Sequence, residues 1–123
     1  MGRVMFLMEC KPGMEDEYKR RHKLLMDSRP DSNMEPEGTE EEIQLCKKVW
    51  KLHKNAGIKN YSIFMKENTL YAYMEADNYK KALDTVTSNE IGRKWQEFMN
   101  GILKQKDGKP VFNMIEEEIF YME

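Results

Sequence analysis

The order of strand-like and helix-like segments is the feature of this sequence that most constrains its fold. Residues 3–10 alternate as a strand does, and residues 58–65 and 69–76 form two further alternating segments separated by a short turn. Helical periodicity occurs twice before the second strand and twice after the third. The order strand, helix, helix, strand, strand, helix, helix, strand predicts an α+β fold of the ferredoxin-like split βαβ type, with helices on one face of an antiparallel sheet.

The first half of the chain contains two predicted helices that flank a loop. One face of the first helix carries apolar and aromatic positions, namely Met14, Tyr18, His22, Leu25 and Met26. Residues 28–38 contain two prolines and few apolar residues, so we predict a surface loop, inserted between the helices. Thr39 and Glu42 have the spacing of a capping box at the start of the second helix, and Gly57 is placed to end it.

The second half contains two short helices and a last strand. Asp77 and Ser88 are the predicted N-caps of the two helices. The inner face of the later helix is formed by Ile91, Trp95, Phe98, Met99 and Ile102. We predict a loop over residues 106–110 and a strand over residues 114–122.

Several predicted strands are apolar on both faces. Helices on one face of the sheet leave the other face uncovered, and a second copy of the chain would bury it. We therefore expect a homodimer with a dimeric α/β-barrel arrangement, in which a ligand binds between sheet and helices or between the two sheets.

Composition limits the classes of protein to consider. The 123 residues suffice for a single domain spanning residues 1–123. A net charge of −2 offers no basic surface for nucleic acid, and no apolar run reaches the roughly 20 residues of a membrane span. The N-terminus lacks a signal-peptide pattern, and the two cysteines lie far apart without histidine neighbours. We expect a cytoplasmic protein that binds no nucleic acid or membrane and has no metal site or disulfide.

Two side chains of the first predicted helix are candidates for acid–base chemistry. Tyr18 and His22 are spaced i, i+4 on a face that also carries apolar residues, so both are expected to point toward the protein. Imidazole exchanges protons near neutral pH, and a neighbouring phenol can orient a hydroxyl group. The competing interpretation is a structural tyrosine beside a half-exposed histidine. His53 lies at the end of a helix, where a cation interacts favourably with the helix dipole, and we predict a structural role for it.

Aromatic side chains could line a carbohydrate pocket or fill the core. The candidates are Tyr61, Tyr71, Tyr73, Trp95 and Tyr121. Ring faces stack on sugar C–H groups and phenols hydrogen-bond to hydroxyls, but spacing alone does not separate the two roles. Phosphate-binding glycine loops, dinucleotide fingerprints and the Gly-x-Ser-x-Gly nucleophile motif are all absent from the sequence.

Four short motifs resemble those of one family, the L-rhamnose mutarotases. They are EYKRRH at 17–22, NYSI at 60–63, RKW at 93–95 and EIFY at 118–121. The resemblance extends over nearly the whole chain, as one mutarotase-like domain, except for about residues 27–45. It implies a dimeric ferredoxin-like fold that interconverts the α and β anomers of L-rhamnose without a metal or organic cofactor.

The resemblance also implies roles for single residues. His22 matches the family's general acid, Tyr18 and Tyr61 match sugar-binding phenols, and Trp95 matches the first of two consecutive tryptophans in the pocket. Gln96 stands at the position of the second tryptophan, so an amide replaces one ring at a substrate-binding position. The partner of His22 in proton transfer is left open, with Glu118 or a bound water molecule as candidates.

Three functions are compatible with the sequence. The first is a mutarotase acting on L-rhamnose or a related 6-deoxy sugar. The alternative is a non-catalytic ligand-binding or regulatory domain on the same dimeric scaffold, suggested by Gln96 and the inserted loop. A cofactor-independent monooxygenase ranks lowest, because it rests on fold analogy alone.

Overall fold

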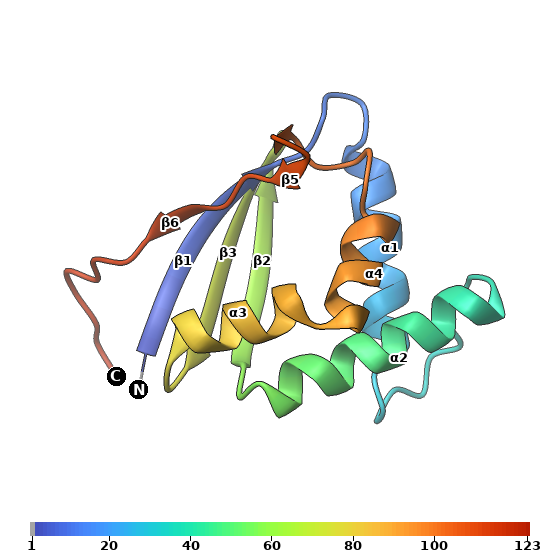
Figure 1. Cartoon of the computed structure of the whole chain (residues 1–123), viewed down its shortest axis with the longest axis horizontal. Helices are drawn as coiled ribbons and strands as arrows, with labels where there is room; N and C mark the ends of the chain where they lie inside the picture. The colour runs from blue at the N-terminus through green and yellow to red at the C-terminus, as the bar shows by residue number, and fades with distance from the viewer. Residues whose placement is uncertain (1) are drawn as a thin grey trace.

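The computed structural model describes residues 2–123 and shows a mixed α+β domain (Figure 1). In chain order the elements are β1 (Gly2–Glu9), α1 (Glu15–Asp27), α2 (Glu40–Asn55), β2 (Lys59–Lys66), β3 (Thr69–Ala76), α3 (Tyr79–Ser88), α4 (Glu90–Phe98), β4 (Gln105–Lys106), β5 (Lys109–Pro110) and β6 (Asn113–Ile115). The prediction of an α+β domain with an antiparallel sheet and four helices is confirmed for this part of the chain.

The main sheet has the strand order β2-β3-β1-β6. β1 and β3 pair antiparallel along their whole length, from Gly2 opposite Ala76 to Glu9 opposite Thr69. The helices lie together on one side of this sheet (Figure 1). The loop predicted at 106–110 contains a small hairpin made by β4 and β5.

Alternate residues of β1 and β3 form the sheet side of the core. Val4, Phe6 and Met8 are nearly fully buried on β1, and every second residue of β3 is buried opposite them. Successive side chains of a strand point to opposite faces, so these residues all face the helices. The helical side of the core includes Ala82, Val86, Met99, Ile102 and Leu103. Removal of this apolar surface from water is the main stabilising contribution to the domain.

The other face of the sheet has no helix of residues 2–123 over it and carries a row of apolar side chains. Phe64 lies opposite Tyr71, and Tyr71 lies opposite Leu7, so the three side chains form a row across β2, β3 and β1. Phe64 is 68% exposed and Tyr71 is 36% exposed. The apolar pattern on both faces that the sequence indicates is therefore present in the strands.

The connection between α1 and α2 matches the sequence in most respects. Residues 28–38 contain no helix or strand. The capping box is confirmed, since Thr39 Oγ1 accepts a 3.1 Å hydrogen bond from the Glu42 amide and Glu42 Oε1 accepts a 3.0 Å bond from the Thr39 amide. On α1, however, Leu24 is buried and Met26 is 54% exposed, so the buried face is rotated from the one predicted.

The last predicted strand is wrong for most of its length. Only Asn113–Ile115 pair with β1, and residues 116–123 have no regular structure. Glutamates at 116–118 explain this difference, because neighbouring like charges and the low strand propensity of glutamate disfavour pairing. Arg3 holds this tail instead, with two 2.9 Å hydrogen bonds to the Glu118 carboxylate and its guanidinium 3.6 Å from the centre of the Tyr121 ring.

The predicted caps of α3 and α4 are each wrong by one residue. Asn78 caps α3 in place of Asp77, and Asn89 caps α4 in place of Ser88. In both cases the two neighbouring residues have short polar side chains suited to capping, and the asparagine is the one whose side chain accepts a backbone N–H bond.

Candidate active site

A cavity of about 150 Å³ lies between the sheet and the helices. Side chains from β1, β2 and all four helices of residues 2–123 line it. Its volume is that of about five water molecules at ~30 Å³ each, and it is below the ~300–1,000 Å³ usual for drug-sized ligands. A compact ligand such as a monosaccharide fits these dimensions.

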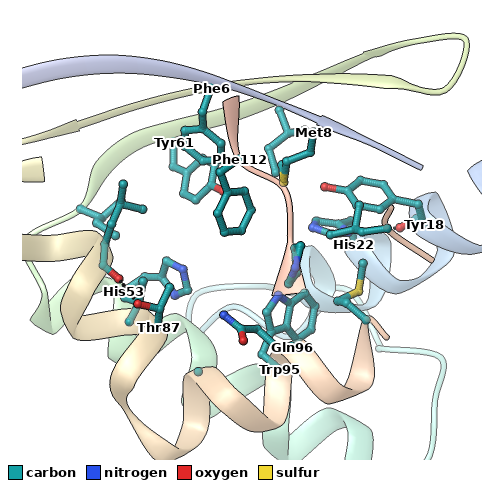
Figure 2. A pocket seen from close by; sticks show the side chains of 18 of the residues that line it. Phe6, Met8, Tyr18, His22, His53, Tyr61, Thr87, Trp95, Gln96 and Phe112 are labelled. Carbon is teal, nitrogen blue, oxygen red and sulfur yellow. Dashed lines mark hydrogen bonds between the residues drawn. The ribbon is translucent and has the colours of Figure 1, made fainter. Parts of the chain in front are cut away.

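The structure brings all five residues of the predicted site into this cavity. Tyr18 and His22 reach it from α1, Tyr61 from β2, and Trp95 and Gln96 from α4 (Figure 2). Most of the remaining lining is apolar, including Phe6, Met8, Ile63, Leu83 and Phe112.

Tyr18 and His22 form a stacked pair on one face of α1. Their ring centroids are 4.0 Å apart with an angle of 20° between the planes, as the i, i+4 spacing permits. Tyr18 is only 4% exposed, so its ring supports the imidazole from the protein side. Burial also raises the pKa of the Tyr18 phenol, so its hydroxyl stays protonated.

The imidazole of His22 is neutral at physiological pH. Burial lowers its pKa to about 4, although the bond to the backbone carbonyl of Tyr18 opposes this shift. Nδ1 lies 3.2 Å from that carbonyl, and a carbonyl can only accept, so Nδ1 carries the proton. Nε2 is therefore the unprotonated nitrogen, a hydrogen-bond acceptor and a base.

Trp95 forms the wall next to His22. Its ring meets the imidazole edge-on, with centroids 5.6 Å apart, and it packs against Phe98 at 5.4 Å. Arg21 joins α1 to α4 at this point, because it donates to the Phe98 carbonyl and its guanidinium lies 4.7 Å from the Phe98 ring centre. Glu17 accepts a 2.8 Å hydrogen bond from Arg21 and so fixes the Arg21 side chain.

A β-bulge places Tyr61 at the mouth of the cavity. The pairing of β2 with β3 shifts by one residue between Lys59 and Ser62, and Asn60 has a φ of 49°. Tyr61 then packs edge-on against Phe6, with ring centroids 6.2 Å apart, and stays 38% exposed. Burial of its hydroxyl raises the pKa of the phenol, which therefore stays protonated beside the cavity.

His53 is a lining residue to which the sequence assigned only a structural role. It lies in the last turn of α2, its ring centre is 6.1 Å from that of Tyr61, and burial lowers its pKa. The sequence does contain a signal for this position, because His53 continues the helical stripe that includes the buried Cys46 and the half-buried Trp50. A polar residue on a buried stripe is the kind of position that can face a ligand.

The other candidates from the sequence lie outside the cavity. Tyr73 donates a 2.7 Å hydrogen bond to Glu75, and Tyr121 and Glu118 contact Arg3. Tyr71 is on the open face of the sheet. No aspartate or glutamate within residues 2–123 lines the cavity.

Two features named in the sequence analysis, a metal site and a membrane-spanning helix, concern residues 2–123 as a whole. The described chain has no cluster of three or more His, Cys, Asp or Glu side chains with the geometry of a metal site. None of its helices combines the length and apolar character that crossing a membrane requires.

The molecule is thus an antiparallel α+β domain with a small cavity in which two histidines lie among phenol and indole rings, a lining suited to small polar ligands. Comparison with known proteins identifies the family. The family model described as L-rhamnose mutarotase matches residues 34–122. The chain therefore belongs to the L-rhamnose mutarotase family, as the resemblance in its motifs indicated.

Individual relatives match along the whole chain. The L-rhamnose mutarotase of Listeria monocytogenes serotype 4b is 33% identical, with 99% of each chain covered. The L-rhamnose mutarotase of Formosa agariphila is 32% identical over 100% of both chains. A crystal structure of an L-rhamnose mutarotase from Formosa agariphila superimposes with a TM-score of 0.69, 29% identity and complete coverage of both chains.

Proposed function

We propose that this protein is a mutarotase that interconverts the α and β anomers of L-rhamnose or a related 6-deoxy sugar. The observation that carries the proposal is the neutral imidazole of His22, stacked on Tyr18 inside a monosaccharide-sized cavity of a chain that belongs to the L-rhamnose mutarotase family. The names of the relatives do not favour the alternative of a non-catalytic binding domain.

His22 transfers the proton of the anomeric oxygen. In ring opening, Nε2 takes the proton of the anomeric hydroxyl and the carbonyl double bond forms. The bond from the anomeric carbon to the ring oxygen breaks, and its electron pair goes to the ring oxygen. A water molecule protonates that oxygen and becomes the hydroxide that takes the same proton back when the ring closes. After rotation about the C1–C2 bond, the reverse steps close the ring on the other face of the aldehyde.

The resting state of His22 sets the order of its roles. Because its imidazole is neutral, His22 begins as a general base, and the imidazolium formed in ring opening becomes the general acid that returns the proton in ring closing. Water is the proposed second partner because no carboxylate of residues 2–123 lines the cavity and the raised pKa of Tyr18 makes its phenol a poor proton donor. This chemistry needs no metal or organic cofactor.

The remaining predicted site residues hold the sugar. Trp95 offers a ring face for stacking on C–H groups, and the hydroxyls of Tyr18 and Tyr61 hydrogen-bond to sugar oxygens. Gln96 supplies an amide with both a donor and an acceptor. These contacts keep the anomeric carbon beside His22 Nε2.

NMR saturation transfer between the two anomeric protons of L-rhamnose tests the proposal directly. The wild type should transfer saturation, and His22→Asn should reduce the catalysed exchange by about 10²–10⁴-fold, the usual contribution of one general acid–base group. Arg20→Ala is the matched control, because Arg20 is an exposed residue on the same helix. Equal exchange by wild type and His22→Asn would place proton transfer elsewhere. Binding of 6-deoxy sugars without exchange would identify a non-catalytic domain.

We also propose that two copies associate through the open face of the sheet into a ferredoxin-like dimer. The row formed by Leu7, Tyr71 and Phe64 supplies apolar surface for such an interface. The C-terminal tail, residues 116–123, has further exposed apolar side chains, since Ile119 is 89% exposed and Met122 is 80% exposed in the single chain. Exposed contiguous apolar surface of this kind is typical of protein–protein contacts.

A further inference from the structure

The cavity has a second polar side that the proposed mechanism does not use. Figure 2 shows His53 and Thr87 on the side of the cavity away from Tyr18 and His22, and Gln96 between the two sides. His53 comes from α2, Thr87 from α3 and Gln96 from α4, so three separate helices contribute one polar side chain each to the lining.

The ring of His53 has a defined hydrogen-bonding state. Nδ1 lies 2.9 Å from the carbonyl of Val49, which can only accept, so Nδ1 donates and Nε2 is left as an acceptor. Residues 2–123 contain no buried side-chain nitrogen or oxygen atom that lacks a hydrogen-bond partner. Since Nδ1 makes the hydrogen bond of this ring within the protein, Nε2 has no protein partner in the described chain and is open to solvent, on a side chain that lines the cavity.

The neighbouring groups have complementary capacity. Thr87 Oγ1 donates 2.8 Å to the Leu83 carbonyl, so its oxygen presents lone pairs rather than a proton to the cavity. The Gln96 amide can donate and accept. This side of the cavity therefore consists mainly of acceptors, set in a wall of apolar side chains such as Leu83 and Val86. The groups that match acceptors in a small, uncharged ligand are hydroxyls.

We infer that His53 binds a substrate hydroxyl on the side of the sugar ring opposite the anomeric centre, and that it contributes in this way to the choice of sugar. The inference rests on the proposed function. With the anomeric carbon beside His22, the ring atom opposite is C4, so the C4 hydroxyl of L-rhamnose donates to His53 Nε2. His53 does not touch the reacting atoms; it orients the ring and selects sugars with a hydroxyl at this position.

Binding of two sugars to three proteins tests the inference. Isothermal titration calorimetry with L-rhamnose and with its 4-deoxy analogue should show about three- to tenfold tighter binding of L-rhamnose to the wild type, the effect of one hydrogen bond. His53→Leu removes the acceptor and should bind both sugars within about twofold of each other. His53→Gln keeps an acceptor and should retain most of the preference. For anomer exchange, His53→Leu should raise KM and leave kcat within about twofold, as expected for a contact made equally in ground and transition states.

A second measurement on the unmodified protein guards against misfolded variants. In a ¹⁵N-histidine-labelled wild type, L-rhamnose should shift the Nε2 resonance of His53, and the 4-deoxy analogue should shift it much less. Equal binding of both sugars by the wild type, an unchanged preference in His53→Leu, or equal Nε2 shifts would each overturn the inference. The tests of this inference and of the proposed function can fail independently. Absence of anomer exchange would refute the mutarotase activity, whereas the preference of His53 for a sugar with a C4 hydroxyl is measured by binding, without catalysis.

Discussion

Both histidines of the chain are held in the same way, by a bond from Nδ1 to the carbonyl four residues earlier on the same helix. This local bond fixes the ring and the tautomer without any contact from another element. It leaves Nε2 of each ring, one on α1 and one on α2, for the cavity that both helices line. Two i, i+4 hydrogen bonds within helices thus leave two Nε2 atoms as acceptors. Their different positions in the cavity give them the different roles proposed above, proton transfer for His22 and hydroxyl binding for His53.

The lowered pKa of His22 predicts the pH dependence of anomer exchange. The base form is the active one in ring opening, so kcat/KM should stay level from pH 7 to about pH 5 and fall as the pH approaches about 4. The unfolded chain titrates this histidine near pH 6.5 and therefore binds more protons between about pH 6.5 and 4, so the free energy of unfolding should decrease as the pH falls through that range. Initial exchange rates across this range, with circular dichroism at each pH as a check on folding, give the profile. An inflection near pH 6.5 would contradict the burial of His22.

The two tryptophans provide a matched pair for testing the cavity wall. Trp95 lines the cavity, whereas Trp50 donates to the Leu25 carbonyl and holds α2 to α1. Trp95→Leu should raise KM for L-rhamnose about tenfold, because the ring that stacks on the sugar is lost. Trp50→Phe should leave KM within about twofold and lower the melting temperature instead. In the Trp50→Phe background, L-rhamnose should change the remaining tryptophan fluorescence. An unchanged KM in Trp95→Leu would show that the sugar does not contact this wall.

Sequence motifs indicated which residues would lie together where local spacing or the family pattern determines their position, but not where only the packing of the fold determines it. Tyr18 and His22 could be placed on one face by helical spacing alone, and the structure brings both into the cavity. Trp95 and Tyr61 came from the family resemblance, because spacing could not separate pocket residues from core residues. His53 was not assigned to the site, although it continues the helical stripe of Cys46 and Trp50, because a stripe does not tell whether its last residue faces a cavity or packs in the core; the packing of α2 decides that.

Among the elements, α1 and α4 meet beside the cavity, where the Trp95 ring of α4 contacts the His22 ring of α1. Arg21, on α1, spans this junction through its contacts with the carbonyl and the ring of Phe98 on α4. Arg21 itself does not line the cavity. Since His22 and Trp95 lie on the two helices that Arg21 joins, their relative position depends on it. Arg21 is thus a positioning residue.

Substitution of Arg21 should therefore reduce catalysis from a distance. Arg21→Ala should lower the free energy of unfolding by about 1–2 kcal/mol through loss of a hydrogen bond from a charged group. It should also lower kcat about tenfold by displacing His22 relative to the sugar. Arg20→Ala is the control, because Arg20 shares Glu17 as its partner but is exposed, and it should change stability by less than about 0.5 kcal/mol. Urea unfolding and exchange kinetics measure the two effects; equal results for both variants would remove Arg21 from this role.

At the level of elements, the sequence predicted strands and helices well and their ends less well. The alternating segments and the capping box of α2 are purely local patterns, and they lie close to their predicted places. The caps of α3 and α4 were ambiguous because two adjacent residues could each serve. The tail over residues 116–123 has strand-like apolar residues, but the pairing with β1 ends at Ile115, where the run of glutamates at 116–118 begins.

The whole molecule creates the cavity, and no single element could. Its lining runs from Phe6 near the N-terminus to Met114 near the C-terminus and includes residues of β1, β2 and β6 in the main sheet and of all four helices of residues 2–123. The sheet supplies a wall of closely packed apolar side chains, and the helices supply nearly all the polar ones. A sugar bound there would have its C–H faces against rings and its hydroxyls toward the helices, which is the division of contacts that a carbohydrate requires.

The open face of the sheet predicts an association of two copies. Phe64 is the most exposed member of the row with Tyr71 and Leu7, so Phe64→Glu places a charge within the proposed interface. Light scattering after size-exclusion chromatography should give twice the mass of 14.7 kDa for the wild type and the single mass for Phe64→Glu. Lys51→Ala on α2 makes the same change in net charge on an exposed position remote from the sheet and should remain dimeric. A monomeric wild type would contradict the dimer. Anomer exchange by monomeric Phe64→Glu at the wild-type rate would then show that each cavity, enclosed within one chain, works without its partner.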